Sequence, residues 1–349
     1  MITYRHGNLL QSDAEALVNT VNCVGVMGKG IALQFKQAFP ANFSAYQKAC
    51  KAEAVQPGKL LVVDTGNMIN PRWIINFPTK THWRAPSQIG YIEQGLADLV
   101  RVIREYHIQS IALPPLGCGN GGLDWQQVQP LIETALANLS DVEVLIYPPQ
   151  PAPDADSMPV ATQTPQMTRA RALFIKLIEQ YSLPGYRLSL LEIQKLSYFL
   201  QMAGEPLKLD FKAHIYGPYA ENLNHVLQRI EGHFIRGYGD RSKDAEIHLQ
   251  PDAVALADEF LQGDADAGQR LARIKALIEG FETPYGMELL ATVHWVQQEN
   301  PAANDADIVR QVHQWSRRKQ ALMRDSHILK ALSRLRAEGW INLPETNTA

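Results

Sequence analysis

Two glycine-rich segments carry the clearest chemical signal in the sequence. They read VNCVGVMGKGIA over residues 21–32 and PPLGCGNGGLDW over residues 114–125, and each lies between an apolar run and a helical pattern. The backbone N–H groups of such a loop bind phosphate, together with the first turn of the helix behind it. Glycine allows the positive φ angles and the close approach that this requires. Two such loops in one small domain favour a diphosphate ligand.

Neither segment fits a standard nucleotide motif. Gly28-Lys29-Gly30 lacks both the earlier glycine and the following Ser or Thr that a Walker A loop needs. Gly117, Gly119 and Gly122 fit GxGxxG, but a Rossmann fingerprint usually opens its domain, whereas this one follows a late strand. We interpret both segments as phosphate loops of another α/β fold, with plain tight turns as the alternative.

Three polar side chains near these loops are candidates for chemistry, and each also has a structural interpretation. Lys80, in NFPTKTHWR, is by composition alone a solvated lysine in a loop. Asp124 precedes a helical pattern, and the run DWQQ that it opens is typical of a capping box. Asn22 fits a turn residue in the left-handed conformation. The residues alone leave both interpretations open.

Strands and helices that alternate along the chain must position these side chains. Short apolar runs predict strands at residues 16–22, 60–64, 73–77, 110–114 and 142–147. Helical patterns separate them at residues 31–38, 88–105 and 124–139. Strands that alternate with helices predict an α/β fold, with a sheet covered by helices on both faces.

A proline-rich stretch, PPQPAPDADSMPVATQTP, divides the chain at residues 148–165. Such composition is typical of a linker. We therefore expect a first domain at residues 1–150, a linker at 151–166 and a mainly α-helical domain at 167–349. In the last, helices are predicted at residues 166–181, 189–202, 219–230, 251–262, 270–282, 284–299 and 305–318, with short strands at 213–215, 234–236 and 246–249.

The composition is that of a globular chain. Its 349 residues are 46% hydrophobic and 20% charged, which fits about two domains. No long apolar run and no export signal are visible, so we expect no membrane span. The three cysteines, Cys23, Cys50 and Cys118, show no zinc spacing, and the ten histidines show no ligand spacing. We expect no metal and no cofactor, and the few, odd-numbered cysteines favour the cytoplasm.

Charge is uneven in the second half. Residues 240–307 hold 14 acidic and 5 basic residues, whereas residues 310–336 hold 8 basic and 1 acidic. An acidic stretch is commonly a solvated helical surface. The alternative is a surface that imitates nucleic acid.

The segments VNTVNCVGVMGKGIALQFKQAFP, INFPTK and LPPLGCGNGGLDW, in this order, resemble the macrodomain family, an ADP-ribose-binding α/β/α fold with a mixed sheet. They are similar to the branch that contains terminal ADP-ribose glycohydrolase, which has MGKG or MGAG in the first loop, a lysine after the central strand and an acidic residue in the second loop. The resemblance covers about residues 1–147. It departs at Gly7-Asn8-Leu9, where many macrodomains have Gly-Asp-Ile, so Asn8 replaces the acidic adenine contact.

The resemblance implies catalytic roles for Lys80, Asp124 and Asn22. Lys80 would attack the anomeric carbon of the distal ribose or its ring-opened aldehyde, or would act as a cation that stabilises developing charge. Attack needs a neutral amine, so burial or nearby cations must lower its pKa from about 10.4. Asp124 would protonate the leaving base or resolve a lysine adduct, and Asn22 would orient the distal ribose. The implied ADP-ribose contacts are Asn8, Leu9, Gly28, Lys29, Gly30, Ile31, Thr79, Gly117, Cys118, Gly119, Asn120, Gly121, Gly122 and Leu123.

The whole layout resembles the DarG family of antitoxins. The resemblance implies that a cognate toxin, DarT, attaches ADP-ribose to a DNA base, with thymidine favoured and guanosine as the alternative. The macrodomain would remove the group and release ADP-ribose, acting as a DNA ADP-ribosyl glycohydrolase. The C-terminal domain would bind and block the toxin. The competing hypothesis is a non-catalytic ADP-ribose-binding module coupled to a protein-interaction domain.

Overall fold

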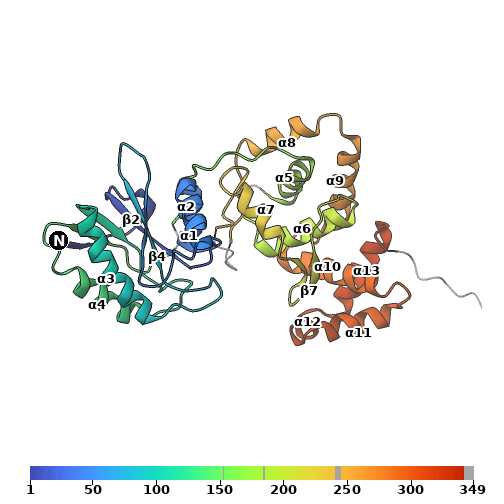
Figure 1. The fold of residues 1–349 in the computed structure, drawn as a ribbon. Helices are drawn as coiled ribbons and strands as arrows, with labels where there is room; N and C mark the ends of the chain where they lie inside the picture. The colour runs from blue at the N-terminus through green and yellow to red at the C-terminus, as the bar shows by residue number, and fades with distance from the viewer. Residues whose placement is uncertain (152, 184, 240–244, 342–349) are drawn as a thin grey trace, which may run out of the picture. The chain divides into compact units, whose positions relative to one another are not determined.

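The computed structural model describes residues 1–151, 153–183, 185–239 and 245–341. The chain forms two compact units, Met1–Gln163 and Thr164–Ala349 (Figure 1). Each unit has a hydrophobic core of its own. No helix among the described residues is both long and apolar enough to cross a membrane.

The first unit is built on a six-stranded mixed sheet with the order β1-β6-β5-β2-β4-β3. All neighbours are parallel except β3, which runs antiparallel to β4. The central strands are buried on both faces, which explains why they appear in the sequence as continuous apolar runs. The strands are β1 (Ile2–Tyr4), β2 (Ala16–Val21), β3 (Leu61–Asp64), β4 (Trp73–Pro78), β5 (Ser110–Leu113) and β6 (Glu143–Ile146).

Helices cover both faces of this sheet, which confirms the predicted α/β/α arrangement (Figure 1). Side chains from α3 (Ile89–Glu105) and α4 (Trp125–Leu136) share a core with Val18, while α1 (Gly30–Ala38) shares one with Leu17. Adjacent residues of a strand point to opposite faces. The short strand β1 and the helix α2 (Pro40–Lys51) were not predicted from the sequence.

Parallel strands bring the loops of interest to one edge. The strands β2, β4 and β5 run parallel, so their carboxyl ends lie together. From these ends leave the first glycine loop (residues 22–29), the lysine loop (79–88) and the second glycine loop (114–124). Helix α1 begins after the first of these loops, and α4 begins after the last.

Part of the proline-rich stretch packs on the first unit. Gln150 exchanges hydrogen bonds with the backbone of Gly7, and Gln11 donates to the carbonyl of Ser157 over 3.2 Å. Further along, the N–H of Ala161 donates to the carbonyl of Gln37 over 2.9 Å. We call the described residues of this stretch, 150–151 and 153–161, the strap, because they extend the first unit beyond its last strand. The strap contains one short 3-10 helix, Ala155–Ser157.

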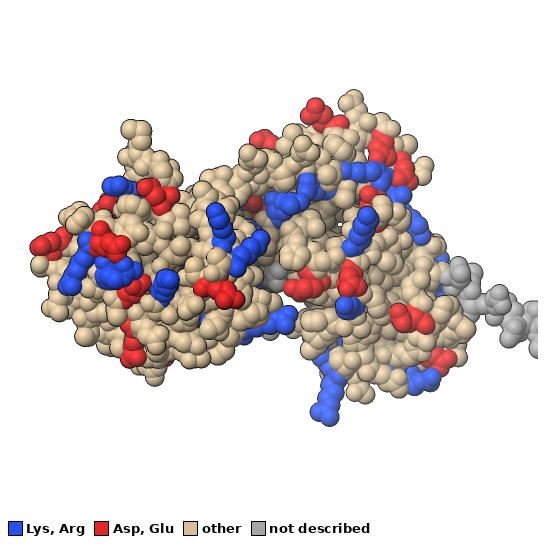
Figure 2. Space-filling model, viewed as in Figure 1, with Lys and Arg blue, Asp and Glu red and all other residues tan. Residues whose placement is uncertain are grey.

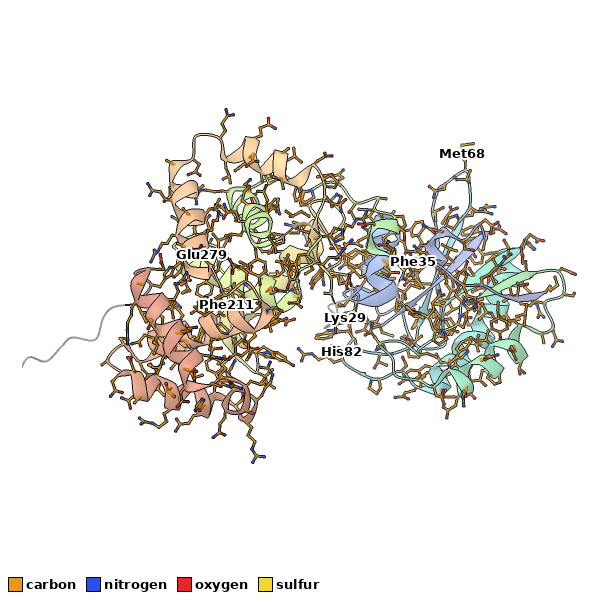
Figure 3. All side chains as sticks on the ribbon, turned by 180° about the vertical axis from the view of Figure 1, so that it is seen from behind. Lys29, Phe35, Met68, His82, Phe211 and Glu279 are labelled. Atoms are coloured by element: carbon orange, nitrogen blue, oxygen red, sulfur yellow. The ribbon has the colours of Figure 1, made fainter. Side chains whose placement is uncertain are left out.

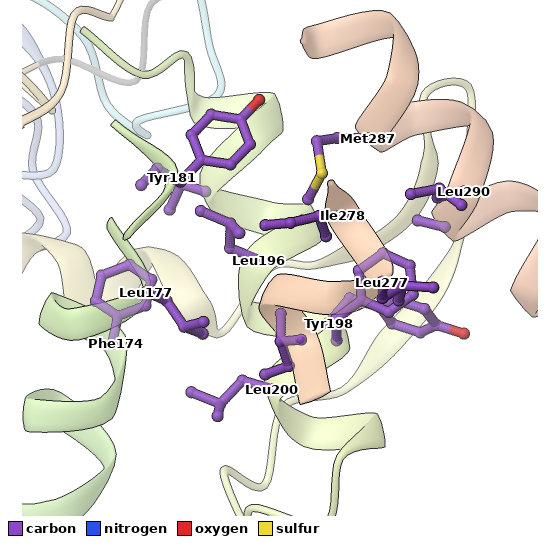
Figure 4. Packing of buried hydrophobic residues seen from close by; sticks show 14 of the residues in the cluster. Phe174, Leu177, Tyr181, Leu196, Tyr198, Leu200, Leu277, Ile278, Met287 and Leu290 are labelled. Carbon is purple, nitrogen blue, oxygen red and sulfur yellow. The ribbon is translucent and has the colours of Figure 1, made fainter. Parts of the chain in front are cut away.

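The second unit is mainly helical with short strands, as predicted. Helices α6 and α10 form its centre, and Figure 4 shows Leu196 and Met287 from these helices among the packed side chains. The helices are α5 (Arg169–Tyr181), α6 (Leu190–Met202), α7 (Leu223–Ile230), α8 (Ala253–Leu261), α9 (Ala265–Ile278), α10 (Pro284–Glu299), α11 (Asp305–Trp315), α12 (Arg317–Leu322) and α13 (Asp325–Ala337). The strands are β7 (Phe211–His214), β8 (Gly217–Ala220), β9 (Ile235–Arg236) and β10 (His248–Leu249).

Three helix predictions in this unit were wrong in part. The helix predicted at residues 270–282 is displaced, because α9 begins at Ala265, after the N-cap Asp264, and ends at Ile278. Residues 219–222 do not begin a helix, because β8 pairs there with β7. The hairpin turns at residues 215–216, and β8 begins at Gly217, whose φ is 88°. The helix predicted over residues 305–318 ends at Trp315. Ser316 is extended, with φ −166°, and caps the following helix by accepting a hydrogen bond from Lys319.

The centre of the second unit also buries charge. Lys319 is fully buried, and its ammonium group lies 2.7 Å from a carboxylate oxygen of Glu288. Lys195, also buried, donates to the carbonyl of Pro218 over 2.6 Å. Burial, and then the neighbouring charge of Lys319, lower the pKa of Lys195 to about 7.

Candidate active site

The three loops at the sheet edge meet at Lys80. Its amine donates a 2.8 Å hydrogen bond to the backbone carbonyl of Asn120, 40 residues further along the chain. A Cβ placed on Gly30 would lie 2.8 Å from the side-chain nitrogen of Asn120, so the start of α1 approaches the same point. The N–H of Cys23 donates to the carbonyl of Thr81 over 3.1 Å. The structure therefore brings both glycine loops together around the lysine loop.

Burial acts on the amine of Lys80. Partial burial lowers its pKa from the usual value, because the charged form is less well solvated there. Within the described part of the chain, no carboxylate forms an ion pair with this amine; its hydrogen bond goes to the neutral carbonyl of Asn120. A lysine in this setting retains a lone pair or a charge for a ligand, depending on its protonation state.

The second glycine loop has a tightly constrained backbone. Gly117 has φ 74°, and its carbonyl accepts from the N–H of Leu123 over 3.1 Å. A Cβ on Gly121 would lie only 2.2 Å from both the carbonyl oxygen of Gly117 and Oγ of Ser87. The N–H of Ser87 in turn donates to the carbonyl of Gly121 over 2.9 Å. Only glycine fits at position 121 in this conformation.

The side chain of Asn22 stabilises the conformation of the first glycine loop. Its side-chain oxygen accepts from the N–H groups of Val24 and Val26, and its amide nitrogen donates to the carbonyl of Val26 over 2.6 Å. The buried hydroxyl of Tyr46, on α2, donates to the carbonyl of Asn22 over 2.6 Å. These contacts give Asn22 a positioning role in the loop.

Asp124 is the N-cap of α4, as one of the two sequence interpretations expects. Its carboxylate accepts from the N–H of Gln126 over 3.0 Å and is otherwise exposed. No hydrogen bond or ion pair joins Asp124 to Lys80 among the described residues. The carboxylate lies near Cys118, since its charge contributes to raising the pKa of that thiol to about 11, after the larger effect of burial.

The other predicted ligand contacts fall into two groups. Gly28, Lys29 and Thr79 belong to the loops at the sheet edge; Lys29 is the exposed N-cap of α1 and Thr79 is buried. Leu9 and Ile31 pack in one apolar cluster on the α1 face of the sheet.

Asn8 lies beside the strap. Its side-chain oxygen caps a short 3-10 helix by accepting from Leu10. Its amide nitrogen lies 3.4 Å from the sulfur of Met158. Met158 packs against the same apolar cluster as Leu9 and Ile31.

The thiols near the site are protonated at neutral pH. Burial raises the pKa of both Cys23 and Cys118 to about 11. Cys23 donates weakly to the carbonyl of Lys80 and Cys118 to that of Leu116, each over 3.5 Å. These residues behave as small fillers of the loops.

Sequence reasoning missed two residues that shape the site. The hydroxyl of Tyr46, on α2, donates to the first loop at Asn22, and the N–H of Ser87 donates to the second loop at Gly121. Neither gives a local signal, because each acts on a segment far away in the sequence. The exposed residues His82, Trp83 and Arg84, next to Lys80, were also not singled out. Figure 3 labels His82 and Lys29 at the same end of the first unit.

The sequence of this chain is similar to those of known proteins. Residues 18–132 match the model of the Macro domain family. A DNA ADP-ribosyl glycohydrolase of Thermus aquaticus is 49% identical over 350 residues, which covers 99% of this chain and 97% of the relative. A DNA ADP-ribosyl transferase-DNA ADP-ribosyl glycohydrolase fusion protein of Thermosipho africanus is 37% identical over 158 residues, 41% of this chain and 40% of the relative.

Among solved structures, the macrodomain of Mycobacterium tuberculosis DarG is 63% identical; it covers 43% of this chain and 99% of that one, with a TM-score of 0.43. The predicted macrodomain and the predicted hydrolase class are confirmed by these relatives. The near-complete coverage of the Thermus aquaticus relative decides the family: the chain belongs to the DNA ADP-ribosyl glycohydrolases, the DarG family, and its first unit is a macrodomain.

Proposed function

We propose that the first unit removes ADP-ribose from a DNA base and that Lys80 carries the reaction. The observation that supports this most directly is the position of its amine, 2.8 Å from the second glycine loop and beside the first. The two loops would hold the diphosphate and the distal ribose through their N–H groups and the starts of α1 and α4. Lys80 would then face the bond between the anomeric carbon and the base nitrogen.

The reaction breaks this N-glycosidic bond and adds water. A neutral Lys80 attacks the anomeric carbon as its bond to the base nitrogen breaks, and the base leaves with the proton that the amine loses. The sugar ring then opens to a Schiff base with Lys80, and water releases ADP-ribose from this adduct. Burial, which lowers the pKa of Lys80, increases the neutral fraction. A charged Lys80 would instead stabilise charge as the bond breaks. Asp124, exposed at the start of α4, is the candidate for proton transfer to the base.

A mass spectrum tests this proposal. The full chain is incubated with a thymidine-ADP-ribosylated oligonucleotide, and the same is done with Lys80→Ala and with Lys51→Ala, an exposed lysine on α2. We expect wild type and Lys51→Ala to restore the unmodified oligonucleotide and Lys80→Ala to leave it modified. Binding of ADP-ribose without cleavage by wild type would support the non-catalytic module. If a guanosine-modified oligonucleotide is cleaved in a parallel reaction and the thymidine-modified one is not, the substrate base is guanine.

The second unit is proposed to bind and neutralise the toxin DarT. Support comes from the Thermosipho africanus relative, whose name joins a DNA ADP-ribosyl transferase to a glycohydrolase in one chain. The predicted boundaries assign this role to residues 167–349, joined by the linker at 151–166. Its test is full-length Lys80→Ala, which should still inhibit the transferase although it cannot reverse the modification.

DNA mimicry is the proposed mode of this inhibition. Acidic side chains of residues 245–307 lie on several helices, and Figure 2 shows both charge signs on the visible face. Some of these acids are paired: Lys176 lies 2.7 Å from Asp258, and Arg169 lies 2.8 Å from Asp264. Asp240 and Asp244, counted in the acidic run, lie outside the described residues. The exposed acids that remain for a basic partner include Asp252, Glu259 and Glu279.

Charge reversal tests the mimicry. We expect the triple change of Asp252, Glu259 and Glu279 to Lys to weaken inhibition of the toxin at least tenfold. The matched control reverses three exposed acids of the first unit, Glu53, Glu93 and Asp141. Equal inhibition by both triple variants would eliminate DNA mimicry by this surface and leave toxin binding to another one.

A further inference from the structure

An exposed aromatic and basic group follows Lys80 directly. Trp83 is 45% exposed, and its ring lies 5.4 Å from that of His82, with 31° between the planes. The guanidinium of Arg84 lies 4.4 Å from the centre of the Trp83 ring. We call residues 82–84 the aromatic step. It places two aromatic rings and one permanent positive charge within four residues of the amine.

The aromatic step is held in place from both sides. The carbonyl of Thr81 accepts from Cys23 in the first glycine loop, and the N–H of Ser87 donates to Gly121 in the second. Within the step, the N–H of Arg84 donates to Nδ1 of His82 over 3.2 Å. The N–H of Ala85 donates to the carbonyl of His82 over 3.0 Å. A short segment pinned in this way presents its side chains at a fixed place beside the loops.

The aromatic step does not build the core. Trp83 is absent from each hydrophobic cluster of the described first unit, whereas Trp73 and Trp125 pack against one of them. A large, partly exposed aromatic side chain next to a candidate binding site indicates a contact with a ligand more strongly than a scattered apolar residue on the surface does. Packing therefore does not explain a tryptophan at position 83.

We propose that the aromatic step binds the single-stranded DNA that flanks the modified nucleotide, with a neighbouring base stacked on Trp83 and a phosphate paired with Arg84. The inference rests on the proposed function. If the glycine loops hold the ADP-ribose, the rest of the substrate leaves the site past Lys80, where the bond is cut. Bases stack on aromatic side chains without regard to sequence, and cations beside them hold the backbone. The aromatic step would therefore allow the site to bind an ADP-ribosylated DNA strand more tightly than free ADP-ribose or a single modified nucleotide.

Two substrates distinguish this role from a structural one. We measure kcat and KM of the full chain on an ADP-ribosylated oligonucleotide and on the corresponding ADP-ribosylated mononucleotide. Loss of one stacked base corresponds to about a tenfold change in affinity. Trp83→Ala should therefore raise KM for the oligonucleotide about tenfold, with kcat nearly unchanged and with no effect on the mononucleotide. Trp83→Phe, which keeps a stacking face, should recover most of the loss.

Arg84→Ala should reduce the dependence of oligonucleotide KM on salt, because one phosphate contact is lost. The control is Arg104→Ala, which removes the same charge at the far end of α3, about 22 Å along the helix from its start beside the lysine loop. An equal change in KM on both substrates, or no change in KM with the oligonucleotide, would contradict DNA binding by the aromatic step.

A failure of the proposed hydrolysis is separable from a failure of this inference. If wild type does not cleave the oligonucleotide, binding of the modified strand is compared between Lys80→Ala and the double variant Lys80→Ala, Trp83→Ala by fluorescence anisotropy. Weaker binding of the modified strand by the double variant would support DNA binding by the aromatic step in the absence of turnover. Equal binding by the two variants would contradict it.

Discussion

The amine of Lys80 and the backbone carbonyl of Asn120 are joined by a 2.8 Å hydrogen bond that links the lysine loop to the second glycine loop. A carbonyl oxygen accepts a hydrogen bond but carries no full charge, so it orients the amine without fixing it as an ammonium ion. Burial acts in the same sense by lowering the pKa of Lys80. The hydrogen bond therefore orients the amine of Lys80 and leaves it able to gain or lose a proton.

The pH dependence of the reaction reports which state of Lys80 acts. If the neutral amine attacks, kcat rises as pH increases through the lowered pKa, because the reactive form then accumulates. We expect this rise, and we expect borohydride added during turnover to leave ADP-ribose attached to Lys80, visible in the intact mass. Lys80→Arg, which keeps the charge but cannot lose its proton, should be inactive. A rate that falls with pH, together with an active arginine variant, would assign the electrostatic role.

Adding one methyl group to the second glycine loop should destabilise the first unit. In Gly121→Ala the new Cβ meets backbone oxygen at 2.2 Å, so the loop must move away from Ser87. We expect faster hydrogen exchange over residues 85–124 and weaker ADP-ribose binding. Gly119→Ala is the control for folding, since nothing lies within 4 Å of its Cβ. The same exchange pattern in both variants would show that the close contact does not constrain the loop.

Removing the side chain of Met158 should loosen the strap. Met158 packs partly buried against the cluster of Leu9 and lies beside Asn8, so Met158→Ala loses about 1 kcal/mol of packing. We expect faster amide exchange in residues 7–11 and 155–161. Met68→Ala is the matched control, because Met68 is fully exposed at a hairpin tip (Figure 3). Strap amides that exchange in wild type as fast as in a free peptide would contradict the packing.

Lys195 should make stability depend on pH. Its pKa is about 7 in the folded chain and higher in the unfolded chain, so between these values the unfolded state binds more protons. Stability then rises with pH above 7, by about 1.4 kcal/mol per pH unit for this group. Below pH 7 both states are protonated and the slope disappears.

The variant Lys195→Met removes this contribution. Denaturant unfolding of the second unit between pH 7 and 10 should therefore be flatter for Lys195→Met than for wild type. Lys330→Met, at an exposed position of α13, should keep the wild-type slope. Parallel slopes in all three chains would mean that Lys195 is charged inside the folded unit.

Local patterns predicted much of the fold. The strands β2, β4 and β5 lie within one residue of their predicted bounds, because strands buried on both faces have uninterrupted apolar sequences. The capping role of Asp124 was among the interpretations, since a cap depends on neighbouring residues alone. The two glycine loops were visible in the sequence because glycine is needed at particular positions of their backbone.

Long-range contacts were beyond the reach of these patterns. Helix α2 was missed because it has little apolar surface; it buries mainly Asn42 and Tyr46. The strap resembles a linker in composition, yet hydrogen bonds from Gln150 and Gln11 attach it to the first unit. The commitment of Asn22 to its own loop depends on Tyr46, 24 residues away. Such roles emerge only when the folded chain brings distant segments together.

The bond between Tyr46 and Asn22 has a consequence for how such a chain can vary over generations. Tyr46 lies on a helix that supplies none of the proposed ligand contacts, yet its hydroxyl supports the backbone that leads into the first glycine loop. We therefore expect a substitution of Tyr46 to change which residues are tolerated at position 22, and the reverse, although only Asn22 borders the site.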